Sequence, residues 1–302
     1  MNNKDASSNK DTNTIDTPKK SFGDIMSTQI TFSDIKNGYN KATSTIASYW
    51  SKVQFINTFM LKLIAIIVMT IDHTGHMLGI DYINGRNYLS DTFTYDQYIM
   101  LRTIGRIAFP IFCYLIVEGF FYTRNVWKYS GRLLVFALIS QIPFNLMQTR
   151  EIYTPGCNTN VFFTLFFGLL AVTVLDACIK AAKKAKENPD YVTFSNGRYY
   201  AVGIIFAVAM MLVAETLKTD YDSLGVIIIL LFYIFRGKPV RLFISLYLAI
   251  YYLSTNLEMY ALYAFIPILL HNKKKGPGLK YFFYIYYPLH ITVLFLIWKF
   301  VL

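Results

Sequence analysis

The chain has 302 residues, of which 55% are hydrophobic and 17% aromatic, and its mean hydropathy is +0.38. These values exclude an ordinary soluble domain and predict an all-α, polytopic integral membrane protein. The formal net charge of +11 does not indicate nucleic-acid binding, because the cations fall in short loops between apolar runs and form no patch interleaved with aromatic residues.

The first fifty residues differ in composition from the rest of the chain. Residues 1–27 are rich in Asn, Lys, Asp, Ser and Thr and predict a disordered cytoplasmic tail without the apolar core of a cleavable signal peptide. In residues 28–54, apolar residues recur at helical spacing from Ile35 to Val53. This pattern predicts an amphipathic helix on the anionic inner leaflet, and a cytosolic linker helix is the alternative. Residues 55–302 form the predicted transmembrane domain.

Nine apolar segments follow and predict about nine transmembrane helices in a single bundle. They cover residues 57–79, 97–121, 131–148, 160–179, 199–216, 223–235, 240–253, 257–270 and 281–301. The sixth to eighth are short for a span, which leaves the count open by one or two. Most loop cations fall in alternate loops, so the positive-inside rule places the N-terminus in the cytoplasm and the C-terminus outside.

The first apolar segment contains ionisable residues that are costly inside a membrane. Lys62, Asp72, His73 and His76 all lie in a stretch long enough to cross a bilayer. Each costs a few kcal/mol or more there unless it is solvated or paired, so the default interpretation is a functional site. Helical periodicity places Lys62, His73 and His76 on one face, with roughly 16 Å between Lys62 and His73.

Polar groups from several predicted helices fall at one depth, in the outer half of the bundle. They are His73 and His76 in the first segment, Arg102 and Arg106 in the second, Asn160 and Thr164 at the start of the fourth, and Asp220, Tyr221 and Asp222 before the sixth. Arg102 and Arg106 share a helix face because they are four residues apart. Such convergence predicts a site in the outer half of the bundle.

Some of these residues also have an ordinary structural explanation. Snorkelling to the headgroups explains Arg102 better than the deeper Arg106. Asp72 either orients an imidazole or forms a structural ion pair with Lys62 or an arginine. His76, near the helix end, is either part of the site or solvated and inert.

Two further residues differ in how strongly they indicate function. Asn160 has the alternative of a simple helix N-cap. His290 lies near the middle of the last segment, just past Pro288, where a polar group is costly and a functional role is favoured.

The motifs restrict the chemistry. We expect no metal site, because the sequence has no HExxH motif and no evident further ligand beside Asp72, His73 and His76. No GxSxG nucleophile elbow occurs either, and the cysteines Cys113, Cys157 and Cys178 have no metal or redox spacing. An intramembrane histidine near cations is typical of a general base that deprotonates an amine or hydroxyl, while the cations bind phosphates or a developing oxyanion.

Several motifs follow one another along the chain: residues 61–66 leading to 71–73, residues 101–110, 118–120, 139–144 and 160–164, Asp220 with Tyr221, and residues 287–290. Together and in this order they closely resemble the TraX family. The resemblance runs from about residue 57 to the end of the chain. TraX proteins are linked to N-terminal acetylation of conjugative pilin, and relatives are associated with fimbrial assembly. The resemblance therefore implies a multi-pass protein of a bacterial plasma membrane.

The family is similar to the transmembrane acyltransferases, whose hallmark is a basic residue, ten intervening residues and a histidine in the first core helix. Lys62 and His73 match this spacing. The resemblance implies that His73 is the catalytic base, with Asp72 beside it, and that acetyl-CoA is the donor. Arg102 and Arg106 are similar to the arginine pair of those enzymes.

The resulting hypothesis is an acyltransferase for an amine or hydroxyl on a surface protein or glycan. The residues expected to bind the acceptor are Arg102, Arg106, His76, Asn160, Thr164, Tyr221 and His290, and those expected to bind acetyl-CoA are Lys62, Arg106, Arg124 and Arg132. Two alternatives stay open: a transporter or flippase of a small anionic substrate, and a non-catalytic assembly factor for pili or other surface structures.

Overall fold

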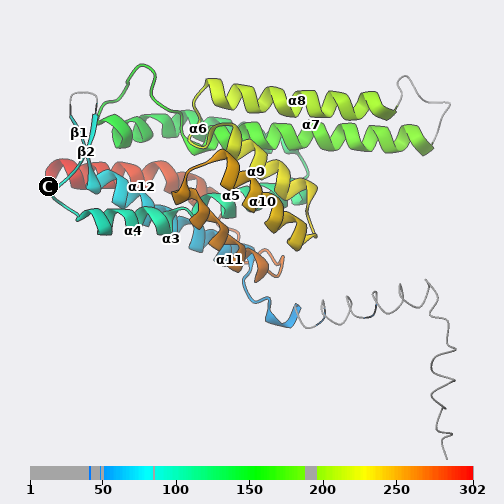
Figure 1. The fold of residues 1–302 in the computed structure, drawn as a ribbon, viewed down its shortest axis with the longest axis horizontal. Helices are drawn as coiled ribbons and strands as arrows, with labels where there is room; N and C mark the ends of the chain where they lie inside the picture. The colour runs from blue at the N-terminus through cyan, green and yellow to red at the C-terminus, as the bar shows by residue number, and fades with distance from the viewer. Residues whose placement is uncertain (1–40, 42–47, 49–50, 84–85, 188–195, 302) are drawn as a thin grey trace, which may run out of the picture. The chain divides into compact units, whose positions relative to one another are not determined.

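The computed structural model describes residues 41, 48, 51–83, 86–187 and 196–301 (Figure 1). The chain divides into two units, residues 1–53 and 54–302. The predicted tail at 1–27 lies outside the described residues, as does most of the predicted helix at 28–54. Residues 51–53 are helical, and the Ser51 hydroxyl donates a hydrogen bond to the Ser48 carbonyl (2.8 Å).

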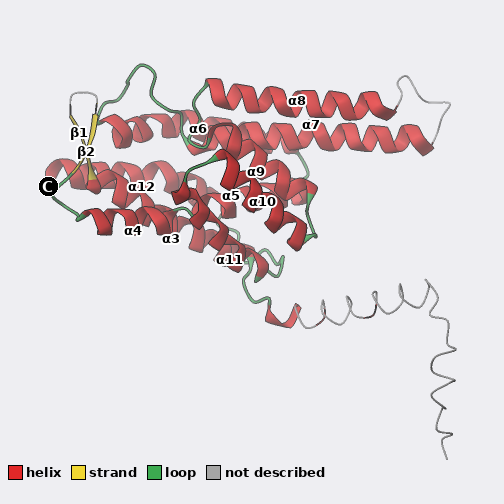
Figure 2. Ribbon diagram, in the orientation of Figure 1, coloured by secondary structure: helices red, strands yellow, loops and turns green. Residues whose placement is uncertain are grey.

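The second unit consists of helices and one short β-hairpin (Figure 2). In chain order these are α3 (Thr58–Gly79), β1 (Ile80–Ile83), β2 (Arg86–Leu89), α4 (Tyr95–Gly105), α5 (Ala108–Tyr122), α6 (Val126–Thr149), α7 (Val161–Glu187), α8 (Asn196–Thr216), α9 (Asp222–Ile234), α10 (Pro239–Leu253), the 3-10 helix η2 (Asn256–Ala264), α11 (Phe265–Leu269) and α12 (Lys280–Phe300). The strands are antiparallel, with Ile80 opposite Leu89.

Six helical stretches in the described part of the chain are long and apolar enough to cross a bilayer: α3, α4 with α5, α6, α7, α8 and α12. This confirms a multi-pass helical membrane protein. The predicted segments 223–235, 240–253 and 257–270 form the shorter apolar helices Asp222–Ile234, Pro239–Leu253 and Asn256–Leu269. The count of nine spans therefore stays a prediction.

The predicted segment 97–121 is a continuous apolar run in the sequence, but it forms two helices in the structure. Helix α4 ends at Gly105 and α5 begins at Ala108. Pro110 explains the division. In an uninterrupted α-helix its ring would clash with the Arg106 carbonyl, and proline has no backbone N–H to donate to that carbonyl. Gly105 permits close contact with α3, since a Cβ there would overlap the Asp72 side chain. The break therefore holds Arg106 against α3.

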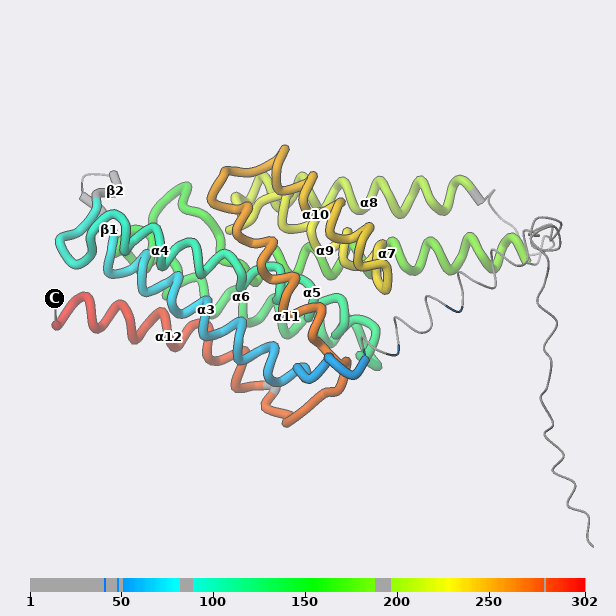
Figure 3. The backbone as a smooth tube through the Cα atoms, turned by 60° about the horizontal axis from the view of Figure 1, so that its bottom comes forward, coloured from blue at the N-terminus to red at the C-terminus, as the bar shows by residue number. Residues whose placement is uncertain are grey.

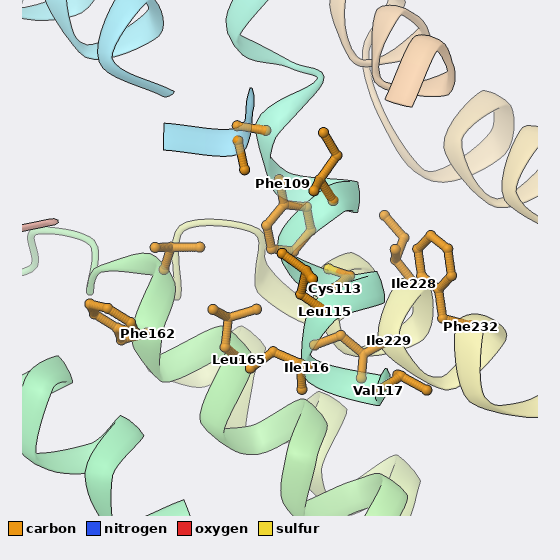
Figure 4. Packing of buried hydrophobic residues seen from close by; sticks show 14 of the residues in the cluster. Phe109, Cys113, Leu115, Ile116, Val117, Phe162, Leu165, Ile228, Ile229 and Phe232 are labelled. Atoms are coloured by element: carbon orange, nitrogen blue, oxygen red, sulfur yellow. The ribbon is translucent and has the colours of Figure 1, made fainter. Parts of the chain in front are cut away.

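Helix α5 lies at the centre of the bundle, where it contacts α3, α7, α9 and η2. Its residues Phe109, Cys113 and Val117 are buried, and Figure 4 shows them among side chains of α7 and α9 such as Leu165 and Ile229. Helix α12 packs against α3 and α6, and α7 packs along α8 (Figure 3). The first and last long helices of the chain, α3 and α12, thus lie side by side.

Candidate active site

Two buried histidines from opposite ends of the sequence form a pair. His73 on α3 and His290 on α12 are joined by a 2.7 Å contact between Nδ1 of His73 and Nε2 of His290. Nδ1 of His290 lies 2.8 Å from the Tyr286 carbonyl oxygen. The two rings are nearly parallel, with an interplanar angle of 8°.

The Tyr286 carbonyl fixes the tautomers of this pair. A carbonyl oxygen only accepts, so Nδ1 of His290 carries the proton and Nε2 of the neutral ring is an acceptor. Nδ1 of a neutral His73 must then be the donor to it, which leaves Nε2 of His73 without a proton. Nε2 has no hydrogen bond within the described part of the chain. His73 therefore carries an available lone pair, which is what a general base requires.

Asp72 does not orient His73. Its Oδ2 accepts from Arg102 (2.7 Å), and its Oδ1 accepts from Arg106 (2.8 Å). Arg106 also donates to Oε1 of Glu258 on η2 (2.7 Å). Of the two alternatives for Asp72, orienting an imidazole or forming an ion pair, the structure shows the ion pair. Glu258 was not among the predicted site residues, and its only signal was an acid at the start of the short apolar segment 257–270.

A small polar cavity of about 60 Å³, called here the histidine cavity, adjoins these groups. Its lining includes the predicted site residues Asp72, His73, His76, Arg102, Arg106 and Tyr221, together with Asp220, Gln148 and Tyr287. Nδ1 of His76 is buried and has no hydrogen-bond partner among the described residues. The volume has room for a few water molecules or a small acyl group.

The turn before α9 supplies Asp220 and Tyr221 to the histidine cavity. Burial raises the pKa of Asp220 to about 6, although the nearby Arg106 opposes the shift. Burial also raises the pKa of Tyr221 well above its usual value, so its hydroxyl stays neutral. The Tyr221 ring stacks on Phe109, with centroids 3.6 Å apart. Asp220 is therefore a carboxylate whose charge changes close to neutral pH.

A second cavity of about 410 Å³, called here the basic cavity, lies at the end of the bundle where α3, α6 and α12 begin. Its cationic lining residues are Lys62, Arg132, Lys273 and Lys275, and most of its other walls are apolar or aromatic. The Lys62 ammonium lies 5.2 Å from the centroid of the Phe283 ring, a cation–π arrangement.

The two cavities are adjacent. Met69, Phe112, Val161 and Tyr287 line both of them. Met69 lies on α3 between Lys62 and His73, so one face of α3 lines the basic cavity near its start and the histidine cavity further along. This is the face that helical periodicity predicted.

Four predicted site residues, Asn160, Thr164, Arg124 and His290, line neither cavity, although His290 contacts His73. Asn160 caps α7 by accepting the Phe162 N–H (3.1 Å), and its amide donates to the Ala137 carbonyl (2.7 Å). The first of these bonds is the N-cap bond of the structural alternative, and the second joins the start of α7 to α6. Thr164 is fully buried, and Arg124 is exposed on the loop between α5 and α6. The described residues contain no group of three or more side chains that could hold a metal.

A third buried histidine, His271, has a different environment. Its Nε2 lies 3.1 Å from the Thr58 hydroxyl, and its Nδ1 lies 2.8 Å from the Tyr114 hydroxyl. Both ring nitrogens are thus in hydrogen bonds. Burial lowers the pKa of His271, so the ring is neutral at neutral pH.

Known proteins provide an independent comparison. The family model "TraX protein" matches residues 58–298. The chain is 31% identical over 257 residues to the "Probable fimbrial assembly protein FimC, serogroup H1" of Dichelobacter nodosus, an alignment that covers 79% of this chain and 94% of that protein. It is 24% identical over 192 residues to the "Uncharacterized protein RP591" of Rickettsia prowazekii (strain Madrid E), covering 64% of this chain and 61% of the relative. No solved structure is significantly similar. This chain belongs to the TraX family.

Proposed function

We propose that this protein is a membrane-embedded acyltransferase that moves an acetyl group from acetyl-CoA to an amine or hydroxyl acceptor, with His73 as general base. The observation that carries the proposal is the contact of Nδ1 of His73 with His290, which leaves Nε2 of His73 unbonded among the described residues, beside a small polar cavity that adjoins a larger basic one. An acyl transfer needs such a base close to the nucleophile and a separate binding region for the donor.

The predicted orientation in the membrane assigns the basic cavity to the donor and the histidine cavity to the acceptor. With the N-terminus in the cytoplasm, the starts of α3, α6 and α12 lie on the cytoplasmic side. Acetyl-CoA would enter the basic cavity from the cytosol, with its thioester directed toward His73. The acceptor, a surface protein or glycan, would enter the histidine cavity from the outer side. Its carboxylate Asp220 can accept a hydrogen bond from the N–H of an acceptor amine, and its arginines suit a developing oxyanion.

The chemical step follows from the protonation state of His73. The acceptor nitrogen or oxygen attacks the thioester carbonyl carbon while Nε2 of His73 takes its proton. The new C–N or C–O bond forms, the C–S bond breaks, and the departing thiolate of CoA receives the proton from the His73 imidazolium. His290 and the Tyr286 carbonyl keep Nδ1 of His73 protonated throughout.

A second candidate is a non-catalytic assembly factor for pili or other surface structures. The name of the Dichelobacter relative, a probable fimbrial assembly protein, favours it. In that case the charged cluster of Asp72, Arg102 and Arg106 would serve helix packing rather than chemistry.

Labelled acetyl-CoA separates the two candidates. The full chain in nanodiscs is incubated with labelled acetyl-CoA and with surface proteins and glycans from a strain lacking the gene. The acyltransferase proposal predicts label in one of these fractions and none with His73→Ala at equal expression. If the wild type transfers no label, while His73→Ala restores surface assembly in the deletion strain, the assembly factor is correct.

A further inference from the structure

The segment 271–279, called here the strap, connects α11 to α12 and is fastened to the start of α3. The Thr58 N–H donates to the Lys274 carbonyl (2.8 Å), and the Asn272 N–H donates to the Ile56 carbonyl (2.8 Å). The Lys274 N–H donates to Oδ1 of Asn272 (2.9 Å). The backbone of the strap is therefore held in a defined position at the basic cavity.

The strap contains two residues with left-handed backbone conformations. Lys273 has φ 61° and Gly276 has φ 67°. A Cβ at Gly276 would come within 2.7 Å of Oδ1 of Asn57, the N-cap of α3, so glycine is needed there. Lysine at positive φ is unfavourable, and such conformations concentrate at functional sites. Of the three consecutive lysines in the strap, Lys273 and Lys275 line the basic cavity, whereas Lys274 between them does not.

The groups that share this cavity with the strap lysines favour an anion. Arg132 lines it, and its buried Nε has no hydrogen-bond partner among the described residues. Glu118 is the acid in the described lining, and its two oxygens already accept from Arg236 (2.8 and 3.2 Å). The cavity therefore has an excess of positive charge beside an apolar and aromatic wall.

We propose that Lys273, Lys275 and Arg132 form a phosphate-binding site for an amphipathic organic phosphate whose stem lies along the apolar wall. The inference deepens the proposed function and rests on it for the identity of the ligand. The phosphates of acetyl-CoA would bind at the strap, and its pantetheine arm would extend past Met69 toward His73. A phospholipid headgroup presents the same chemistry from a different source.

Neutralising the strap lysines tests this site, and the neighbouring Lys274, which lies outside the cavity lining, serves as the control. Lys273→Gln, Lys275→Gln and the double variant are compared with Lys274→Gln, which removes the same charge from the same strap outside the cavity. The full chain is placed in nanodiscs of zwitterionic lipid, and binding of CoA and of pantetheine is measured by calorimetry. We expect the double variant to bind CoA at least tenfold more weakly with a smaller dependence on salt. Lys274→Gln should stay within about twofold of wild type, and pantetheine binding should not change.

The Lys273→Arg/Lys275→Arg variant should restore CoA binding, and equal melting temperatures confirm that the variants are folded. If CoA binds equally to wild type, the double variant and Lys274→Gln, the phosphate site is wrong while the donor assignment stands. A second arm measures retention of phosphatidylglycerol by native mass spectrometry. If CoA does not bind but the double variant alone loses phosphatidylglycerol, the phosphate site is supported and acetyl-CoA is overturned as donor. If neither ligand binds wild type, both are overturned.

Discussion

His73 and His271 are both buried, yet their hydrogen bonds differ in one decisive way. Hydroxyl groups of Thr58 and Tyr114 occupy both nitrogens of His271. His73 uses only Nδ1, and a second histidine with a fixed tautomer is its partner. A buried histidine with both nitrogens bonded stabilises the fold, whereas one with a free nitrogen beside a cavity can exchange protons with a substrate.

Burial of a histidine in a membrane helix is therefore a weak guide to function by itself. The useful observation is the number of ring nitrogens that the protein already bonds. On this basis we propose the histidine cavity as the reactive region, whereas the cluster around His271 holds α5 and the strap to the start of α3. Four substitutions or conditions test this contrast, in decreasing order of effect on activity.

Loss of the base should have the largest effect. We expect His73→Ala to lower kcat about 10²- to 10⁴-fold, because general-base catalysis contributes that much. His76→Ala is the matched control, since His76 lies one turn away on the same cavity; it should cost less than tenfold. Acetyl transfer from labelled acetyl-CoA by protein of verified folding measures both. A severe loss with His76→Ala and near-normal turnover with His73→Ala would make His76 the base.

Loss of the partner of His73 should have a smaller effect. His290→Phe removes the acceptor for Nδ1–H of His73, so the imidazole is free to change tautomer or orientation, and kcat should fall about 10- to 100-fold. His290→Gln retains an acceptor oxygen and should recover part of that loss. Equal activities for the Phe and Gln variants would show that His290 acts only as a packing residue.

The charge of Asp220 should affect binding of the acceptor more weakly. Its pKa of about 6 means that the carboxyl is neutral below and ionised above that pH. For an amine acceptor, KM should therefore fall about tenfold as the pH rises from 5 to 7, because a charge-assisted hydrogen bond becomes available. Asp220→Asn should remove this pH dependence of KM. The same pH dependence in the variant would exclude Asp220 as its origin.

Replacement of His271 should affect stability rather than chemistry. His271→Phe leaves the hydroxyls of Thr58 and Tyr114 without their partner, at a cost of roughly 1–3 kcal/mol. We expect a lower melting temperature but an activity per folded molecule within about threefold of wild type. A thermal melt and a labelled-acetyl assay on the same sample measure the two quantities. A loss of turnover comparable to that of His73→Ala, without a change in melting temperature, would contradict the structural role of His271.

The sequence predicted helix positions and helix faces well where they depend on the residues of one helix alone. The predicted segments 57–79, 199–216 and 281–301 lie close to α3, α8 and α12. Helical periodicity also predicted the face of α3 that bears Lys62, His73 and His76, and the structure places that face along both cavities. Such features depend on residues within a few turns of one another.

Contacts between distant segments could not be predicted in this way. The bond from His73 to His290 joins residues on the first and last long helices, and no periodicity within either helix identifies its neighbour. The same holds for Arg106 and Glu258. The break between α4 and α5 had a local signal in Gly105 and Pro110, but the continuous apolar run concealed it.

The tautomer of His73 decides whether this histidine can act as the general base, and it can be measured directly. The chain has four histidines, so labelling with ¹⁵N-histidine gives a simple spectrum, and His73→Gln identifies the His73 signals by their loss. Nitrogen chemical shifts at neutral pH distinguish protonated from unprotonated ring nitrogens. We expect a protonated Nδ1 and an unprotonated Nε2 for His73, with the same tautomer for His290. A proton on Nε2 of His73, in either a neutral or a doubly protonated ring, would contradict it.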